Sequence, residues 1–423
     1  MPCVTNALKS WVAAIVMPIA LLAGFTPAGA KGFREQVIHT FCPGQKCLDG
    51  ALPQSGLITD AAGNFYGTTA IGGKNGGGTV FKLAPDGTET VLYSFCTDCA
   101  DGRYPASGLF RDSAGNLYGT AVYGGVTNKV FIDGAGTVFK LAPDGTETAL
   151  HTFCSQSNCT DGANPFSNLI SDSAGNLYGT TNGGGQNGRG VVFRIAPDGT
   201  ETVLYSFCSQ YKCADGAAPF GGLIFDNAGN LYGTTYQGGH SSCYPRRHSG
   251  CGTVFKLAPD GTETVLYAFC HKYKAGCPDG ANPVAGLIAD NAGNLYGTTV
   301  TGTDSLFKLA PDGTLTVLHA FCSLANCADG SGSRGALIAD GAGNLYGTTH
   351  DGGVNSGGTV FELAPSGTFT VLHSFAYCSD LPCSDGDEPA APLLMDGAGA
   401  IYGTTEYGGK GDWGLIFKLV PRQ

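Results

Sequence analysis

Aspartate recurs seven times at one kind of position in this sequence. Each is followed by glycine and comes shortly after a pair of cysteines; the seven are Asp49, Asp101, Asp161, Asp215, Asp279, Asp329 and Asp385. Carboxylates gathered around one centre could bind a calcium ion, the one cofactor that the sequence suggests, or form a collar for a substrate. The alternative is that each carboxylate caps its own Asp-Gly turn. Sevenfold repetition favours the turn, because an active site usually departs from such symmetry.

Closely spaced cysteines precede these aspartates. The pairs are Cys42/Cys47, Cys96/Cys99, Cys154/Cys159, Cys208/Cys213, Cys270/Cys277, Cys322/Cys327 and Cys378/Cys383. In an exported protein such spacing favours local disulfides over metal binding. Cys243 and Cys251 share one long insert with His240 and His248, a mixture that zinc could also use. We expect a disulfide there too, which makes eight in all and leaves no structural zinc.

Two groups of side chains are not repeated, and both are candidates for ligand binding. Tyr244, Arg246, Arg247 and His248 form the one concentrated cationic and aromatic group, which suits an anion or a carbohydrate. Asp385, Asp387 and Glu388 form an acidic patch in the last unit. A polysaccharide hydrolase or lyase would need such a non-repeated pair of acids, or a histidine with a carboxylate. No catalytic residue can be named from the sequence.

Histidine and tyrosine exchange at a further repeated position. His39, His151, His319 and His373 stand where other units have Tyr93, Tyr205 and Tyr267. This exchange indicates packing residues.

Composition restricts the fold and the partners. Of 423 residues, 68 are glycine, and beyond the first 30 no window has the apolar period of a long helix, so an almost entirely β protein is expected. Acidic residues outnumber basic ones by 34 to 23, which disfavours nucleic acids and anionic membranes as partners.

Residues 1–30 have the features of a secretory signal peptide. Lys9 precedes an apolar run from Trp11 to Phe25, and Ala28-Gly29-Ala30 supplies small residues for cleavage. A membrane anchor is the alternative, but the run contains Pro18 and is short for a membrane span. We expect a secreted or periplasmic protein with one mature domain, residues 31–423, and no membrane span after cleavage.

A repeat fills this mature domain. The segment Gly-Asn-(Leu/Phe)-Tyr-Gly-Thr, or a close variant, begins at Gly63, Gly115, Gly175, Gly229, Gly293, Gly343 and Gly399. Each unit has four short apolar runs separated by tight-turn sequences such as Ala258-Pro259-Asp260-Gly261. Four antiparallel strands in each of seven units predict a seven-bladed β-propeller. An open solenoid or a two-domain arrangement is the alternative.

The two ends of the chain favour a closed ring. Val37–Phe41 matches the fourth strand of a unit, whereas the chain stops after Leu415–Leu419, which matches a third strand. The N-terminal strand can therefore complete the last blade and remove two exposed edges. An open solenoid has no need of this offset.

The loops on the two faces of such a ring differ. One face carries nearly constant hairpins, whereas the other carries links of changing length and the crossovers with their cysteines. Function tends to lie on variable loops held by a rigid scaffold. This variable face is therefore the expected binding surface for a glycan, peptide or protein, on a protein expected to be a monomer.

The run from Gly78 to Phe95, Gly-Thr-Val-Phe-Lys-Leu-Ala-Pro-Asp-Gly-Thr-Glu-Thr-Val-Leu-Tyr-Ser-Phe, recurs with small changes and resembles the exported bacterial tandem repeats called GloVer repeats, found in choice-of-anchor proteins. The Asp-x-x-Gly-Asn-Leu-Tyr hairpin is also similar to that of NHL-type propellers. The resemblance implies an exported, propeller-like repeat protein and brings no catalytic residues. Two functions remain: a binding or interaction module that uses the variable face, or a propeller enzyme, a hydrolase or lyase, that acts on a polysaccharide.

Overall fold

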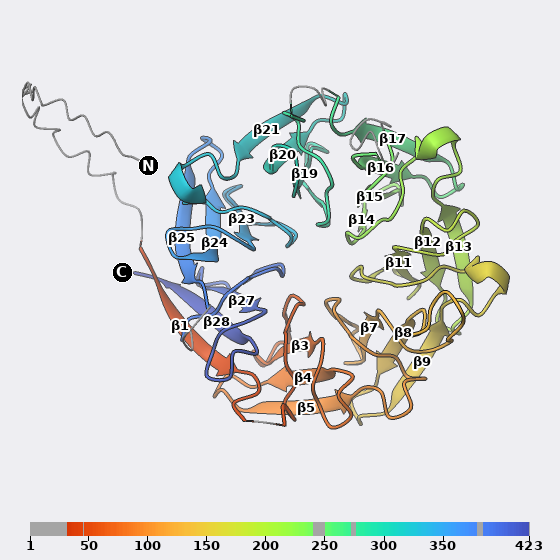
Figure 1. The fold of residues 1–423 in the computed structure, drawn as a ribbon, viewed down its shortest axis with the longest axis horizontal. Coiled ribbons are helices and arrows are strands. Elements are labelled where there is room, and N and C mark those ends of the chain that lie inside the picture. Colours follow the sequence, from red (N-terminus) through yellow and green to blue (C-terminus); the bar gives the residue numbers. More distant parts are fainter. Residues whose placement is uncertain (1–31, 45, 240–249, 272–275, 379–383, 423) are drawn as a thin grey trace, which may run out of the picture. The chain divides into compact units, whose positions relative to one another are not determined.

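The computed structural model describes residues 32–44, 46–239, 250–271, 276–378 and 384–422. Within the compact unit Gly32–Gln423, these residues form seven four-stranded antiparallel sheets around a central axis (Figure 1). The predicted seven-bladed propeller is thus confirmed. The predicted signal peptide lies outside the described residues. In the described part of the chain no helix is long and apolar enough to cross a membrane.

Each blade contributes strands at four distances from the axis. The inner strands are β2 (Ile58–Thr59), β6 (Phe110–Arg111), β10 (Ile170–Ser171), β14 (Ile224–Phe225), β18 (Ile288–Ala289), β22 (Ile338–Ala339) and β26 (Leu394–Met395). The second strands are β3 (Phe65–Thr69), β7 (Leu117–Ala121), β11 (Leu177–Thr181), β15 (Leu231–Thr235), β19 (Leu295–Thr299), β23 (Leu345–Thr349) and β27 (Ile401–Thr405). The third strands are β4 (Thr79–Leu83), β8 (Thr137–Leu141), β12 (Val191–Ile195), β16 (Thr253–Leu257), β20 (Ser305–Leu309), β24 (Ser356–Leu363) and β28 (Leu415–Pro421). The outer strands are β5 (Glu89–Ser94), β9 (Glu147–Thr152), β13 (Glu201–Ser206), β17 (Glu263–Ala268), β21 (Leu315–Ala320), β25 (Phe369–Ala376) and β1 (Phe33–Thr40). We number the blades 1 to 7 in the order of their inner strands.

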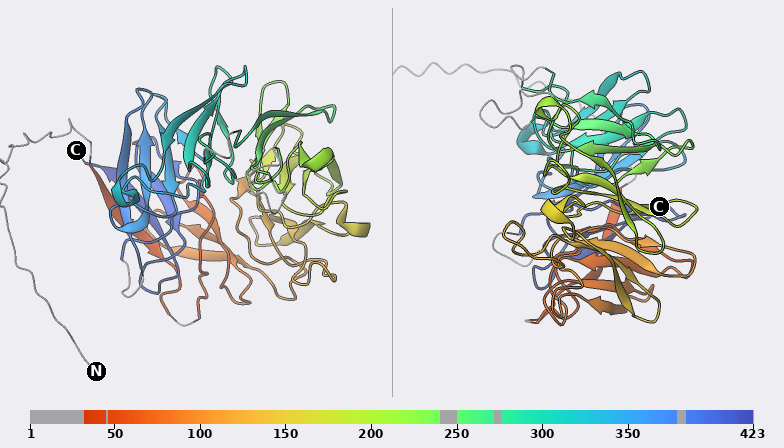
Figure 2. Two further views of the ribbon diagram at one scale, coloured as in Figure 1. Left: turned by 45° about the horizontal axis from the view of Figure 1, so that its top comes forward. Right: turned by 90° about the vertical axis from the view of Figure 1, so that its right-hand side faces the viewer.

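In the described part of the chain, three short 3-10 turns interrupt the crossovers: η1 (Ser157–Cys159), η2 (Tyr211–Cys213) and η4 (Ala325–Cys327). Figure 2 shows these turns on one face of the ring, which is the predicted variable face. We keep the name "variable face" for this side and "hairpin face" for the opposite side.

The ring closes in blade 7 as the offset of the repeat predicted. Strand β1 pairs antiparallel with β28, with Val37 opposite Phe417 and Thr40 opposite Leu415. The two strands come from opposite ends of the chain and lie side by side in Figure 1. Thr404 Oγ1 also donates a hydrogen bond of 3.1 Å to the carbonyl of Ser55 and so joins blade 7 to blade 1.

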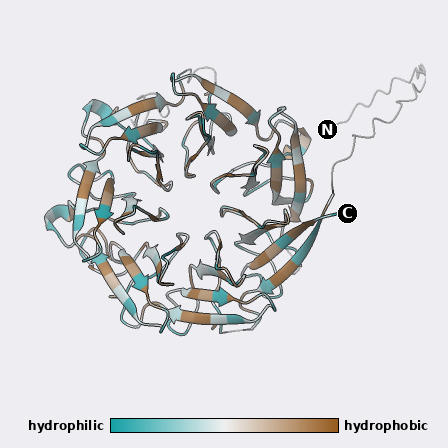
Figure 3. Ribbon diagram, turned by 180° about the vertical axis from the view of Figure 1, so that it is seen from behind, coloured by the Kyte–Doolittle hydropathy of each residue, from teal (hydrophilic) through white to brown (hydrophobic). Residues whose placement is uncertain are grey.

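The hydrophobic core lies in the seams between blades, and Figure 3 shows apolar stretches in the strands of every blade. A phenylalanine at the end of each outer strand, or directly after it, contacts one on the third strand of the next blade. These pairs are Phe41/Phe81, Phe95/Phe139, Phe153/Phe193, Phe207/Phe255, Phe269/Phe307, Phe321/Phe361 and Phe375/Phe417, with ring centroids 5.0 to 5.2 Å apart. The glycine of the Tyr-Gly-Thr segment makes room for these rings, since a Cβ on Gly67 would lie 2.6 Å from Phe81 Cζ.

The hairpin face is built from self-contained turns. Asp226 Oδ1 accepts the N–H groups of Ala228 and Asn230 at 2.9 Å, and Asp226 Oδ2 accepts the Tyr232 hydroxyl at 3.0 Å. The same arrangement recurs in the other blades, for example at Asp340. These aspartates are structural, as the sequence predicted.

The crossovers on the variable face carry the predicted disulfides. Six pairs have both members among the described residues: Cys42–Cys47, Cys96–Cys99, Cys154–Cys159, Cys208–Cys213, Cys270–Cys277 and Cys322–Cys327. Cys251 and Cys378 are also disulfide-bonded, and the partners predicted for them, Cys243 and Cys383, lie outside the described residues. The cysteines of the six pairs have positive φ, so each bridge closes a tight loop.

We expect these disulfides to stiffen single loops rather than to hold the ring together. Replacing Cys96 and Cys99 together by serine should lower the free energy of unfolding by about 2 kcal/mol or less, because the closed loop is short. Chemical denaturation of both proteins measures the difference, and mass spectrometry of unreduced peptides checks the pairing. Collapse of the fold on losing this one bridge would contradict the prediction.

Candidate functional site

The seven Asp-Gly aspartates lie on the crossovers, and among the described residues six of them accept hydrogen bonds from their own loops, whereas Asp385 contacts His373 of the outer strand at 3.8 Å. Asp101 accepts the N–H of Cys96 at 3.1 Å and the Tyr93 hydroxyl at 2.9 Å. Asp329 accepts the N–H of Ser323 at 3.1 Å and lies 3.0 Å from His319 Nε2. This explains why tyrosine and histidine exchange on the outer strand: either can donate to the aspartate.

These contacts favour the turn-capping interpretation of the aspartates. Among the described residues, none of the seven belongs to a group of three metal-ligating atoms within 4.8 Å of one another. Cation binding by this ring of aspartates stays a prediction.

The structure describes one of the two candidate ligand sites and not the other. Tyr244, Arg246, Arg247 and His248 lie outside the described residues. The three acids of the last unit have different partners. Asp385 Oδ2 lies 3.8 Å from His373 Nε2. Asp387 is 3% exposed and accepts the N–H of Cys378, whereas Glu388 contacts His350. They therefore do not form one acidic patch.

A small cavity lies on the axis of the ring. The residue five positions after each Asp-Gly aspartate lines it, one from every blade: Gln54, Ala106, Phe166, Phe220, Val284, Arg334 and Ala390. Its volume is about 360 Å³. Since the whole ring contributes, these seven side chains mark the channel through the propeller.

Two further repeat positions lie beside this ring on the variable face. One is three residues after the aspartate: Leu52, Tyr104, Asn164, Ala218, Asn282, Gly332 and Glu388. The other directly follows the second strand: Ala70, Val122, Asn182, Tyr236, Val300, His350 and Glu406. The two positions are joined by backbone hydrogen bonds, such as Glu406 N–H to Glu388 O at 3.2 Å. We call these two sets, with the seven channel residues, the channel mouth.

The channel mouth breaks the sevenfold symmetry. Blades 3 and 4 contribute aromatic rings, with centroids 5.2 Å apart for Phe166 and Phe220 and 5.6 Å apart for Phe220 and Tyr236. Blades 6 and 7 contribute charged groups instead, among them His350 and Glu388. A uniform scaffold thus presents an aromatic side and a charged side.

The aromatic side opens into a larger pocket of about 920 Å³, which we call the lateral pocket. It extends from Phe220 and Tyr236 to the Cys154–Cys159 loop and to Val126–Phe131 of the blade 2 insert. Its aromatic and amide side chains are Phe131, Phe220, Tyr236, Asn128, Gln156, Asn158, Asn164, Asn182 and Gln237. Lys129 and Arg189 add positive charge, and no carboxylate of the described residues lines the pocket.

Several of these polar groups are available to a ligand. Among the described residues, the side chains of Asn182, Gln237 and Arg189 enter no hydrogen bond. Asn164 Nδ2 is used by the carbonyl of Val122 at 3.0 Å, which leaves its oxygen. The pocket thus offers donors and acceptors beside aromatic faces.

The charged side of the mouth centres on His350. Its Nε2 lies 3.2 Å from Glu388 Oε2 and its Nδ1 lies 3.1 Å from Asp351 Oδ2. Gln54 Nε2 donates to Glu406 Oε2 at 3.1 Å. Burial raises the pKa of Glu388, His350 lowers it, and the neighbouring carboxylates raise it further. His350 and Glu388 thus form a histidine–carboxylate pair that the other blades do not repeat.

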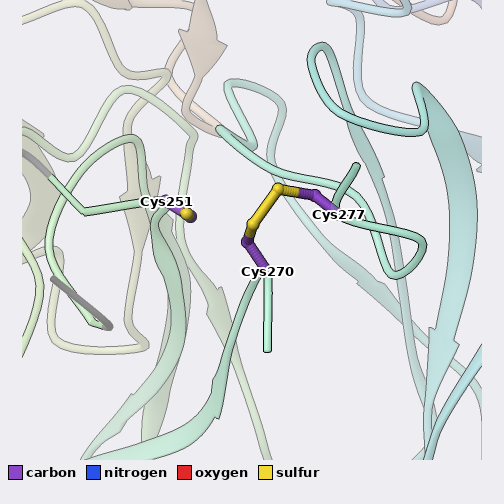
Figure 4. Close-up of side chains that lie close together, drawn as sticks. All are labelled: Cys251, Cys270 and Cys277. Atoms are coloured by element: carbon purple, nitrogen blue, oxygen red, sulfur yellow. A yellow bond between two sulfur atoms is a disulfide. The ribbon is translucent and has the colours of Figure 1, made fainter. Parts of the chain in front are cut away.

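A second cluster of ligand-type atoms consists of cysteines. Cys251, Cys270 and Cys277 are buried and close together (Figure 4). Cys270 and Cys277 are bonded to each other, and Cys251 is also in a disulfide. These sulfurs are therefore not thiolates and are poor zinc ligands.

A family model and solved structures are similar to this chain. No curated protein matches the sequence. The extracellular domain of a protein assigned to a hybrid two-component system of B. thetaiotaomicron is similar to this chain, with a TM-score of 0.55 and 14% sequence identity. The match covers 90% of this chain and 41% of that structure's chain, so this chain spans about two fifths of its length. A protein assigned as a gluconolactonase gives a TM-score of 0.41 and 14% identity over 82% of this chain and 96% of its own. The family model of the Gloeobacter/Verrucomicrobia repeat matches residues 25–246 and 245–423, and the chain therefore belongs to this repeat family.

Proposed function

We propose that this chain is an exported binding module and that its lateral pocket captures a carbohydrate. The observation that carries the proposal is the pocket's lining: aromatic and amide side chains, and no carboxylate among the described residues, in a protein of net charge −11. Concave sites with apolar walls and a few convergent polar groups are the usual form of a ligand site.

The chemistry of the lining matches a sugar. Aromatic rings such as Tyr236 and Phe220 can pack against the C–H faces of a pyranose, while amides donate to and accept from its hydroxyls. Lys129 and Arg189 favour a glycan that carries carboxylate or sulfate groups. A peptide or protein ligand is the alternative outcome of a binding screen.

Export agrees with the disulfides, which persist in oxidising compartments. Tyr244, Arg246, Arg247 and His248 remain candidate ligand contacts. They lie in the same unit as Tyr236 and Gln237, which line the pocket.

The hairpin face is less suited to this role. A cavity of about 920 Å³ also lies there, where blade 7 meets blade 1. Its lining includes the Ala84–Gly87 hairpin, a turn that recurs in most units, and the carboxylates Asp86 and Asp396. Its carboxylates and its recurring hairpin suit a glycan less well than the lining of the lateral pocket does.

We expect Tyr236→Ala and Arg189→Gln each to weaken glycan binding at least about tenfold with little change in melting temperature, because both side chains are partly or fully exposed. A glycan array, with and without calcium, identifies the ligand, and calorimetry measures its Kd. Asp198→Asn, in a hairpin on the opposite face, is the matched control and should bind like wild type. Equal binding by all three variants, or loss only in the control, would show that the ligand sits elsewhere.

A second candidate function, a polysaccharide hydrolase or lyase, is favoured by one observation. His350 and Glu388 form a non-repeated histidine–carboxylate pair at the channel mouth, as general acid–base chemistry requires. Incubating a bound polysaccharide with the protein separates the two functions: a binding module releases no shortened or unsaturated product.

A further inference from the structure

We propose that His350, Glu388 and Glu406 bind one divalent transition-metal ion at the channel mouth. These residues, which we call the histidine–glutamate cluster, belong to blades 6 and 7 and line no part of the lateral pocket. The inference thus goes beyond the proposed glycan binding and does not depend on it.

The geometry brings three ligand atoms together. One atom each from His350, Glu388 and Glu406 lies within 4.8 Å of the others. Bonds of about 2.0–2.2 Å to zinc would need only small side-chain movements to close this group around an ion. One imidazole with two carboxylates suits zinc or manganese better than calcium, which prefers oxygen ligands alone.

The histidine is built into the site. His350 is only 7% exposed, and its Nδ1 is buried without a hydrogen bond among the described residues, although Asp351 Oδ2 lies 3.1 Å away. A metal on Nε2 would place the ring proton on Nδ1, where a small rotation lets it donate to Asp351. Carboxylates commonly orient metal-binding histidines in this way.

A second residue orients one of the glutamates. Gln54 Nε2 donates to Glu406 Oε2 at 3.1 Å, and Gln54 Oε1 accepts the Tyr104 hydroxyl at 3.0 Å. This chain of hydrogen bonds reaches from blade 7 through blade 1 to blade 2. It leaves Glu406 Oε1 for an ion.

The charge around the cluster is unbalanced. In addition to burial, the charges of Asp351, Asp387 and Glu406 raise the pKa of Glu388, whereas His350 lowers it. The neighbouring His350 and the charge of Arg334 lower the pKa of Asp351. Several carboxylates around one buried imidazole favour a bound divalent cation.

The repeat argues that the cluster is not needed for folding. His350 and Glu406 occupy the position directly after the second strand, where the other blades have Ala70, Val122, Asn182, Tyr236 and Val300. Five blades therefore form without a metal-ligating group at this position. A departure confined to two adjacent blades indicates a local role.

The test measures metal binding to the full-length protein after treatment with chelator. We expect about one zinc or manganese ion per chain by elemental analysis. In calorimetry, calcium should bind at least about tenfold more weakly than zinc. Glu388→Gln, Glu406→Gln and His350→Gln should each weaken zinc binding at least about tenfold.

Two controls separate this site from others. Asp312→Asn, an exposed carboxylate on the hairpin face, and Tyr236→Ala, in the lateral pocket, should bind zinc like wild type. Zinc binding should also survive alkylation of any free thiols. Melting curves without metal check that the three cluster variants are folded.

The proposal is overturned if folded cluster variants bind zinc like wild type, if zinc binding is absent or is lost on alkylation, or if calcium binds more tightly than zinc. Because Tyr236→Ala should lose glycan but keep zinc, failure of the metal site and failure of the proposed glycan site give different results.

Discussion

Deletion of residues 31–41 should lower the melting temperature of the propeller by more than about 10 °C. The deletion removes β1, which pairs with β28 on its outer side. It also removes Phe41, which is 0% exposed and packs against Phe81 across the seam to blade 1. Loss of one buried phenylalanine costs about 3–5 kcal/mol. Loss of the strand in addition exposes β28 as an edge and opens the ring.

A peptide with the sequence of residues 33–41 provides the control. Added in excess to the truncated protein, it should pair with β28 and raise the melting temperature again, because ligands of the folded state stabilise it. Calorimetry or tryptophan fluorescence measures both changes. An unchanged melting temperature after deletion would mean that closure by β1 does not stabilise the ring.

The closure could be predicted because it depends on sequence order alone. The repeat gives the number of blades, and the offset between Val37–Phe41 and Leu415–Leu419 gives the missing strand. Alternating apolar residues and constant turns then favour a ring in which each sheet packs between its two neighbours and so buries both of its faces. The pattern of apolar residues and turns within one unit was sufficient to predict the fold, because every blade repeats that pattern.

The candidate site could not be predicted in the same way. The long insert and the acids Asp385, Asp387 and Glu388 stand out in the sequence because of their length and their acidity. The channel mouth is instead formed by single residues within segments of nearly constant length, and only closure of the ring brings Gln54 of blade 1 to Glu406 of blade 7. A signal was present nonetheless: when the seven units are aligned, the position of His350 changes in chemistry while the preceding Tyr-Gly-Thr does not.

Neighbouring acids separated for a related reason. Glu388 has a φ of 56°, so the backbone turns at this residue: Asp387 accepts the N–H of Cys378 within the crossover, while Glu388 contacts His350 at the channel mouth. Proximity in the sequence therefore grouped acids whose side chains lie in different surroundings, and ligand binding by Glu388 stays a prediction.

Raising the pH from about 5 to about 8 should destabilise the propeller. Five glutamates in the outer strands have pKa values raised to about 7, chiefly by burial: Glu35, Glu89, Glu147, Glu201 and Glu263. Each also lies near an Asp-Gly aspartate, as Glu147 does near Asp101, and each has a buried oxygen without a hydrogen bond among the described residues. Their negative charges are therefore unfavourable in the seams.

The sign follows from proton binding. Between the ordinary glutamate pKa of 4.5 and about 7, the folded protein binds more protons at these groups than the unfolded chain, so stability falls as the pH rises. The shift corresponds to at most about 3 kcal/mol for each group. Screening at these half-exposed side chains reduces this to about 1 kcal/mol each, or about 5 kcal/mol together.

Other groups titrate elsewhere, oppose this trend weakly, or reinforce it, as Asp304 does with a pKa that burial raises to about 6. The hairpin aspartates have lowered pKa values, such as about 2 for Asp60, so their contribution is lost only in acid, below this window. Burial lowers the pKa values of His319 and His373, which adds stability as the pH rises toward 6.5. Two histidines offset part of the effect of five glutamates and leave its direction unchanged.

The repeat supplies its own control for this prediction. Blades 5 and 6 carry Leu315 and Phe369 at the glutamate position, and Phe369 stacks on His319 with ring centroids 3.7 Å apart. The seams therefore accept an apolar side chain there. Glu147→Leu with Glu263→Leu should raise the melting temperature at pH 8, change it little at pH 5, and remove roughly two fifths of the pH dependence by the same arithmetic. If the difference in melting temperature between variant and wild type stays constant from pH 5 to pH 8, the seam glutamates do not cause the pH dependence.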